Sequence, residues 1–398
     1  MIEAGDNRPS GLPPVAASVD SEMVQISRAF DWLRAVSPCA TQELWEDFQS
    51  SDCKGTPTFR YRDPGVDIAS TRERLLGLPM QDIEEPVIKA LLAEKQRELE
   101  RQLELMELRG TPGFLQVSID LFGVAAADLY ADARRILDVV SPNRSADSQC
   151  VGADHVTEAA LIQFAYYRRK CADFSAEVKR SGNITAGLMV SNNMLIVSEQ
   201  ARIPRERVDA LLHHEIGTHI LTWHNGGHQP LQQLQCGLAH YDELQEGLGV
   251  LAEYLAGNLS PLRLRTLAAR VIAVRLVTDG AEFGDVFDAL RSEFQFSGRS
   301  AFIIATRVFR GGGLTKDVVY LRGLKDLLAY LREGHPFEQL LVGKFSLSQL
   351  PAIKKLTAMG QLAPPKLLPA YLHNAAAQQR LAECTEVPLE GLYQRLVT

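Results

Sequence analysis

The chain has 398 residues and a formal net charge of −7, with 46% hydrophobic and 23% charged residues. This composition is that of an ordinary globular protein with enough apolar side chains for a sizeable core. The acidic balance, without a block of Lys or Arg, argues against a nucleic acid or an anionic membrane as partner. No apolar run reaches the roughly 18 residues of a membrane span, and residues 1–19 lack the pattern of a signal peptide.

The N-terminal part is predicted to be helical. Residues 1–20 are rich in Pro, Gly, Ser and Ala, which predicts a flexible tail. An N-terminal helical region, 21–150, follows. It ends in a polar loop from Ser141 to Gly152 that marks a candidate boundary. Apolar spacing and N-terminal prolines predict helices over 23–36, 86–110, 112–122 and 125–140.

The central region, 151–335, is predicted to contain a hairpin and further helices. Asp154 is a candidate cap for a helix that runs to about Val178, and Pro204 is expected to begin another helix. The apolar runs 184–190 and 194–197, separated by Ser-Asn-Asn, predict a β-hairpin. A turn is expected over 224–228, with helices over 261–277, 286–294 and after a Thr315 cap, and residues 300–309 form an apolar run. Residues 336–398, interrupted by prolines, predict a C-terminal helical cap.

Two segments of the central region carry candidate chemistry. The first is Leu211-Leu-His-His-Glu-Ile-Gly-Thr-His219, which contains His214, Glu215 and His219. The second, Leu244-Gln-Glu-Gly-Leu-Gly249, contains Glu246. Two imidazoles, an adjacent carboxylate and a later carboxylate are the parts of a hydrolytic zinc site, in which a separate glutamate accepts a proton from water. The alternative is that both histidines are ordinary helix residues.

The spacing of the two histidines predicts an irregular helix. They stand at i and i+5, which on a regular helix places their side chains roughly 140° apart. A one-residue insertion of the π type restores a shared direction, and Gly217 between them would ease the distortion. An unbroken α-helix here would therefore rule out a common metal ion.

Several motifs together resemble the QEGLA-motif proteins, also called flavohemoglobin-expression-modulating proteins, which are relatives of the microtubule-associated tyrosine carboxypeptidases. The resemblance covers most of the chain and rests on the following segments: His214-Glu-Ile-Gly-Thr-His219, Asn225-Gly226, Gln229-Pro-Leu231, Gly237-Leu-Ala239, Tyr241-Asp242, Gln245-Glu-Gly-Leu248, Leu78-Pro79, 86–98, Arg109-Gly-Thr-Pro112, 186–191 and 307–320. Three positions depart from the family pattern, namely His240, Leu244 and Gly249. None of these three is a ligand in that pattern, so they bear on packing and pocket shape.

The resemblance implies a zinc metallopeptidase, most simply a carboxypeptidase. One Zn²⁺ would be held by His214, His219 and Glu246, and Glu215 would act as the general base. The implied fold is α+β and mainly helical, with a zincin-like core, a small sheet or hairpin, and extra helices at both ends. In zincins the hairpin strand lies beside the active helix, although a purely structural hairpin remains an alternative.

The substrate side of the site is predicted from residues 307–320. Arg307, Arg310 and Lys316 lie around a glycine-rich turn and can hold a C-terminal carboxylate of a peptide or protein, with Tyr320 beside them. Tyr320 and Tyr241 are candidate oxyanion donors. The animal relatives remove tyrosine from tubulin, which favours an aromatic final residue. Two other functions stay open: a regulatory or binding protein with a non-catalytic metal, and a hydrolase of a non-peptide amide.

Other histidines and the cysteines are given lesser roles. His224, His228 and His240 are rival metal ligands, although loop histidines are usually only solvated. Glu253 and Tyr254 are either outer partners of the ligands or plain surface residues. The six cysteines form no Cys-x-x-Cys pair, which indicates reduced thiols in a cytoplasmic protein without cysteine-bound metal; they are Cys39, Cys53, Cys150, Cys171, Cys236 and Cys384.

Overall fold

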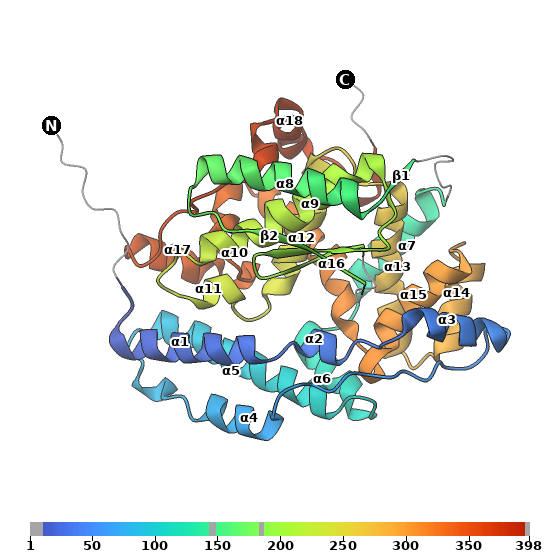
Figure 1. Cartoon of the computed structure of the whole chain (residues 1–398), viewed down its shortest axis with the longest axis horizontal. Helices are drawn as coiled ribbons and strands as arrows, with labels where there is room; N and C mark the ends of the chain where they lie inside the picture. The colour runs from blue at the N-terminus through green and yellow to red at the C-terminus, as the bar shows by residue number, and fades with distance from the viewer. Residues whose placement is uncertain (1–10, 143–148, 183–186, 395–398) are drawn as a thin grey trace.

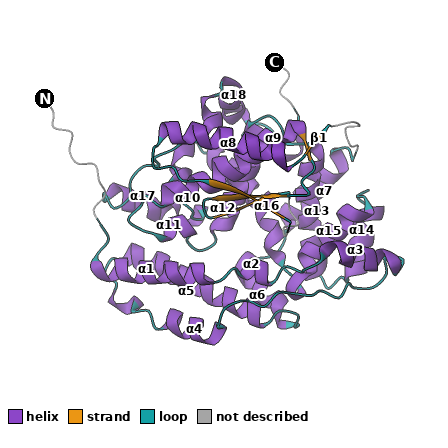
Figure 2. Cartoon of the chain, in the orientation of Figure 1, coloured by secondary structure: helices purple, strands orange, loops and turns teal. Residues whose placement is uncertain are grey.

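The computed structural model describes residues 11–142, 149–182 and 187–394. Helices dominate the described chain, and its strands are few and short (Figure 2), so the prediction of a mainly helical α+β protein is confirmed. In Figure 1 the first helices form a layer along one side, and the helices and strands of the central region lie over it. Within the described ranges, no single helix has the length and apolar character of a membrane span; one bent pair, α6 with α7, has both together.

The N-terminal region is helical, but the helix predicted over 23–36 is broken at Phe30 into two, and the helices over 41–50 and 68–76 were not predicted. Helix α5 begins at Pro86 as expected, because proline in the first turn leaves no hydrogen bond unmade. The first helix begins at Pro14 and buries Ala16 and Val19, so residues 14–20 are helical and the predicted tail is too long. Residues 1–10 of that tail lie outside the described residues. The helices are α1 (Pro14–Ala29), α2 (Trp32–Ala35), α3 (Thr41–Ser50), α4 (Ile68–Leu76), α5 (Pro86–Glu107), α6 (Gly113–Phe122) and α7 (Ala127–Val139).

Five short strands form two small sheets. Strand β1 (Cys150–Val151) pairs antiparallel with β5 (Ile203–Pro204). The other sheet has the order β2-β4-β3, in which β4 runs parallel to β2 and antiparallel to β3. Its strands are β2 (Glu177–Ser181), β3 (Leu188–Ser191) and β4 (Met194–Ser198).

The predicted hairpin is confirmed as β3 and β4. Asn192 turns the chain at φ 55, a conformation that asparagine tolerates better than most residues. The first residues of the predicted hairpin, 184–186, lie outside the described residues. Among the described residues β3 is an outer strand, and it packs against the segment that contains His219.

Two predicted helix boundaries in this region are wrong. Helix α8 (Ala153–Lys170) begins after Gly152, and Asp154 lies within its first turn without acting as the cap. It ends well before residue 178, because residues 177–181 pair with β4 instead of continuing the helix. Pro204 belongs to β5, and the next α-helix begins only at Val208. In both cases strand pairing overrides a local helical signal.

The two motif segments lie on adjacent helices. The first runs through α9 (Val208–His214), the π-helical segment η3 (Glu215–Ile220) and α10 (Leu221–Gly226). Residues 224–226 are thus helical, so the turn predicted over 224–228 begins too early. After α11 (Gln233–Cys236), the second segment forms α12 (Tyr241–Leu255), which packs against α9 and η3.

The remaining helices complete two hydrophobic clusters. Both clusters draw on residues before and after residue 150, and the division into regions stays a prediction. Thr315 does not cap a helix: its hydroxyl donates to the Ser118 carbonyl at 3.0 Å, within the short turn η5 (Thr315–Val318). The helices are α13 (Pro261–Thr278), α14 (Phe283–Ser292), α15 (Gly298–Phe309), α16 (Val319–Arg332), α17 (Leu350–Ala358) and α18 (Ala375–Glu383).

Glycines allow α12 and α16 to approach closely. A Cβ added to Gly323 would lie 2.0 Å from the Glu243 carbonyl oxygen, and one added to Gly247 would lie 2.5 Å from the Gly323 carbonyl carbon. No real Cβ approaches backbone this closely. The backbones therefore touch directly, and this contact fixes the height at which α12 presents Glu246.

Candidate metal centre

The helix that carries the histidine pair is widened between them. Residues Glu215–Ile220 form a π-helical turn, which adds one residue per turn and brings positions five apart onto one face. The rings of His214 and His219 accordingly lie 5.0 Å apart between centroids. The predicted irregularity is confirmed. A Cβ at Gly217 would meet its nearest neighbours at 3.6–3.7 Å, an ordinary contact distance, so space alone does not demand glycine there.

Helix α12 brings Glu246 against both imidazoles. Its Oε2 lies 3.5 Å from Nε2 of His214 and 3.9 Å from Nε2 of His219. The three ligand atoms lie within 4.8 Å of one another. Two ligands about 2.1 Å from a tetrahedral zinc ion are about 3.4 Å apart. An ion of that size therefore fits between these atoms after only small shifts of the side chains.

The ring nitrogen of His214 that does not face Glu246 lies against Glu253. Its Nδ1 lies 3.0 Å from Glu253 Oε1, so Nδ1–H can donate to the carboxylate and Nε2 is left facing Glu246. Glu253 is fully buried and is neutralised by Arg207 at 2.6 Å and Arg263 at 3.1 Å. A carboxylate behind a histidine is the usual outer support of a metal ligand. The seven-residue spacing from Glu246 to Glu253, two turns along one helix face, is the sequence signal for this role.

His219 is oriented in the same manner by a neighbour of Glu246. Its Nδ1 lies 3.4 Å from Oε1 of Gln245, and that oxygen also accepts a hydrogen bond from Thr222 at 2.8 Å. Gln245 belongs to the second motif segment, but no role was predicted for it. Both histidines thus turn Nε2 toward Glu246 and Nδ1 toward a fixed acceptor. Tyr254 does not join this arrangement: its buried hydroxyl has no hydrogen-bond partner.

The buried groups of the cluster shift one another's pKa values. Burial lowers the pKa of His214, but hydrogen bonds with Glu246 and Glu253 outweigh it and raise the value to about 10. Burial lowers the pKa of His219 to about 4, and the His214 charge adds to this. Burial opposes ionisation of Glu246, yet the His214 hydrogen bond and the His219 charge hold its pKa below the usual range. Burial, reinforced by the charge on Glu246, raises the pKa of Glu215 to about 7. A carboxylate in that range can both accept and return a proton near neutral pH.

Two of the predicted substrate residues are already paired with carboxylates. Arg307 donates through Nε and Nη2 to Asp317 at 2.6 and 2.7 Å. Lys316 lies 2.9 Å from Asp242. The side chain of Arg307 remains 29% exposed, whereas that of Lys316 is 6% exposed. The Arg307 side chain thus remains partly accessible, and Lys316 serves mainly to neutralise Asp242.

The charges around Tyr320 leave an excess of positive charge. Burial and the charge on Glu246 raise the pKa of Tyr320, while nearby cations oppose the shift. Arg270, which sequence analysis missed, lies over the Tyr320 ring at 4.9 Å, and its buried Nε has no hydrogen-bond partner. Arg310 bonds to Ser37 at 3.0 Å and also has an unpaired Nε. Arg270 falls outside the motif stretch, in the middle of α13, so no local pattern marks it.

A further cationic group, Lys344, lies near Tyr241 and within the influence of the Glu246 charge. Burial lowers the pKa of Lys344 to about 8, although the charges of Cys236, Asp242 and Glu246 raise it. The Tyr241 ring lies 5.7 Å from Nζ of Lys95 and 5.8 Å from Nζ of Lys344. Lys344 was not singled out in the sequence because it is far from both motifs. Neither Tyr241 nor Tyr320 is distinguished as an oxyanion donor by these contacts.

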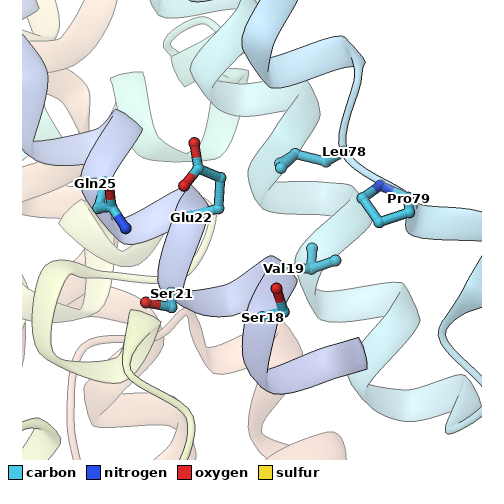
Figure 3. A pocket seen from close by; sticks show the side chains of 7 residues that line it. All are labelled: Ser18, Val19, Ser21, Glu22, Gln25, Leu78 and Pro79. Carbon is cyan, nitrogen blue, oxygen red and sulfur yellow. The ribbon is translucent and has the colours of Figure 1, made fainter. Parts of the chain in front are cut away.

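The rival histidines are not part of the cluster. His240 adopts φ 58 at the start of α12, and its backbone N–H donates to Glu98 at 2.7 Å. His224 and His228 lie instead beside Cys171 and Asp173. A surface hollow of about 460 Å³ between α1 and the segment after α4 (Figure 3) is likewise remote from the cluster; it is lined by Ser18, Val19, Ser21, Glu22, Gln25, Leu78 and Pro79.

Two histidines and a glutamate whose ligand atoms lie within 4.8 Å of one another, next to Glu215, form a group that could hold a metal ion. Residues 46–387 match the microtubule-associated tyrosine carboxypeptidase family, so the chain belongs to that family. The family is one of carboxypeptidases, as the resemblance in sequence had implied.

Solved structures add a distant likeness, and no curated protein sequence matches significantly. A protein of Colwellia psychrerythraea described as a candidate lipoprotein is 11% identical, with a TM-score of 0.41 over 80% of this chain and 66% of that one. A candidate lipoprotein of unknown function from Shewanella oneidensis is 13% identical, with a TM-score of 0.40 over 73% and 72%. This chain thus spans just under two thirds of the Colwellia protein, and likenesses this weak carry no argument about function.

Proposed function

We propose that this protein is a cytoplasmic, zinc-dependent carboxypeptidase that removes a C-terminal residue, with a preference for aromatic residues, from a peptide or protein. The observation that carries the proposal is the π-helical turn. It brings Nε2 of His214 and of His219 to one carboxylate oxygen of Glu246. Membership of a carboxypeptidase family supports the reaction class.

Each residue of the site has a role in this proposal. His214, His219 and Glu246 hold the ion, and Glu253 and Gln245 keep the histidines in the required tautomer. A bound zinc ion supplies Lewis acidity and lowers the pKa of its water toward about 7. Glu215 takes a proton from the attacking water and delivers it to the leaving amine.

The positive charges around Tyr320 provide a place for the substrate carboxylate. Asp317 lies against both Arg307 and Arg270, with Arg270 Nε 3.6 Å from Asp317 Oδ2, so one carboxylate faces two guanidinium groups. The N–H groups of the two arginines that do not face Asp317 can bind a second carboxylate with charge-assisted hydrogen bonds. Arg310 and Lys316 contribute to the positive electrostatic potential and do not contact the substrate carboxylate. This refines the sequence prediction, which had included Arg307 but not Arg270.

The roles of the two motif glutamates are tested by metal analysis together with turnover. Glu215→Gln should abolish peptide cleavage and retain zinc, because a base lies outside the metal's ligand set. Glu246→Ala should lose zinc as well as activity. Glu158→Gln, at an exposed position of α8, is the control and should leave both unchanged. Equal zinc loss in Glu215→Gln and Glu246→Ala would show that the assigned roles are wrong.

Recognition of a free C-terminus is tested with matched peptides. A set ending in Tyr, Phe, Leu, Glu or Lys is offered both free and amidated, and the products are identified by mass spectrometry. A charge-assisted hydrogen bond contributes about 1.5–3 kcal/mol, so amidation should lower kcat/KM at least about tenfold. Arg270→Met and Arg307→Met should lower kcat/KM similarly for free peptides only, whereas Arg291→Met, at an exposed position of α14, should not.

The alternatives predict different results in the same assays. Equal cleavage of free and amidated peptides, or cleavage inside the chain, would point to an endopeptidase. Turnover of small amides but of no peptide would favour a non-peptide amide hydrolase. Bound zinc without any turnover would favour the regulatory role.

A further inference from the structure

A second group of metal-ligating side chains lies away from the His214 and His219 cluster. Cys171, Asp173 and His224 place a sulfur, a carboxylate oxygen and a ring nitrogen within 4.8 Å of one another. Cys171 and Asp173 follow the end of α8, and His224 lies in α10, so two separate segments meet here. His224 is buried while Asp173 is exposed. An ion can therefore enter from solvent and still reach a buried ligand.

The distances suit a small tetrahedral ion. Sγ of Cys171 lies 3.7 Å from Nε2 of His224. Zinc bonds of about 2.3 Å to sulfur and 2.0–2.1 Å to nitrogen separate two such ligands by about 3.6 Å at a tetrahedral angle. Oδ1 of Asp173 lies closer to the sulfur, at 2.6 Å, where the thiol donates a hydrogen bond. An ion would take the place of that shared proton and move the two atoms apart.

The other carboxylate oxygen of Asp173 contacts two side chains that are not among the three ligands. Oδ2 lies 2.7 Å from Nε2 of His228 and 3.2 Å from Nζ of Lys366. Nδ1 of His228 lies 2.8 Å from the His224 carbonyl oxygen, which only accepts hydrogen bonds, so Nδ1 is the donor there. These contacts fix Asp173 so that Oδ1 faces the sulfur. Hydrogen-bonded outer partners of this kind are what orient ligands at metal sites.

We propose that Cys171, Asp173 and His224 form a second metal site, which binds a divalent ion of the zinc class and joins the end of α8 to α10. His228 is a positioning residue for Asp173, and water occupies the fourth position. A set of thiolate, imidazole and carboxylate favours zinc over magnesium or calcium. The ion would tie α8 to the helix end that continues from the π-helical segment. The site does not depend on the catalytic proposal, and it would replace the expectation that no cysteine binds metal.

The test uses a signature that the first cluster cannot give. Cobalt bound to a thiolate produces a charge-transfer absorption band, and His214, His219 and Glu246 include no sulfur. Cobalt-substituted protein should show the band, and Glu246→Ala, which disables only the first cluster, should keep it. Cys171→Ser should remove it. Cys150→Ser, at an exposed cysteine, is the matched control and should behave as the wild-type chain.

The number of zinc ions bound per chain provides an independent test of the second site. With the first cluster also occupied we expect two zinc ions per chain in the wild type, and in either case one ion fewer in both Cys171→Ser and Asp173→Ala. His228→Gln should keep the ligands but weaken the second ion's affinity about 10- to 100-fold. Asp173 is exposed, so its variant gives a result even if Cys171→Ser does not fold. One ion per chain in the wild type together with no thiolate band, or unchanged zinc in Asp173→Ala, would overturn the proposal.

Discussion

The contact between α12 and α16 makes a strong prediction, because it supports Glu246 without touching the ion. In Gly323→Ala, the new Cβ would lie 2.0 Å from the Glu243 carbonyl oxygen, and the backbones would have to separate by about 1 Å to reach even 3.0 Å. Overpacking of this kind costs about 1–3 kcal/mol, occasionally more. The contact is with backbone, which cannot rotate away, so we take about 3 kcal/mol. Alanine regains about 1 kcal/mol through its higher helix propensity.

The net loss of about 2 kcal/mol should lower Tm by roughly 2–3 °C, because the unfolding entropy is about 2.1 cal/mol/K per residue and the chain is long. Zinc affinity should fall too, because a displaced α12 no longer holds Glu246 in its position against the two histidines. Gly284→Ala in α14 is the matched control: its Cβ meets nothing within 4 Å, so it should be neutral or slightly stabilising. Thermal and urea unfolding measure the stability of both variants. If Gly323→Ala were as stable as Gly284→Ala, with unchanged zinc affinity, the inferred close approach would be incorrect.

Three further predictions concern the support of the site and of the fold. Glu253→Gln should weaken zinc binding about 10- to 100-fold in chelator competition and destabilise the fold by about 3 kcal/mol, because two half-buried arginines lose their counter-charge at a fully buried position; unchanged affinity would remove Glu253 from the site. Gly217→Ala should keep its zinc and most of its kcat/KM, since the methyl group meets neighbours only at ordinary distances; loss of zinc would mean that the π turn needs the freedom of glycine. Burial raises the pKa of Asp20 to about 7, although backbone N–H groups of Gln232 and Gln233 lower it. The folded chain therefore binds more protons than the unfolded one, whose Asp pKa is about 3.9, and stability should fall as pH rises from about 4 to 7. In urea unfolding, Asp20→Asn should reduce this dependence of stability on pH. An unchanged dependence would contradict its attribution to Asp20.

The ligand pattern could be predicted because its determinants are local. The five-residue spacing of His214 and His219 admits a shared metal only on a widened helix, and the structure contains that π turn. The proline at the start of α5 and the Asn192 turn of the hairpin likewise depend on backbone preferences of a few residues. Such preferences act before any distant segment arrives, so they can be read from neighbouring residues alone.

Other features were decided only by contacts between distant segments. The helix predicted to run to about Val178 ends at Lys170, and residues 177–181 form a strand because they pair with β4. Lys316 is neutralised by Asp242, and Arg270 joins Arg307 at Asp317, because α12, α13 and η5 meet around Tyr320. The contact between Cys171 and His224 likewise depends on the packing of two distant segments. The sequence by itself determined which side chains can bind metal and how one helix must distort to let them. Which charges remain free, and which distant residues face each other, depended on packing, since burial and pairing energies belong to the assembled fold.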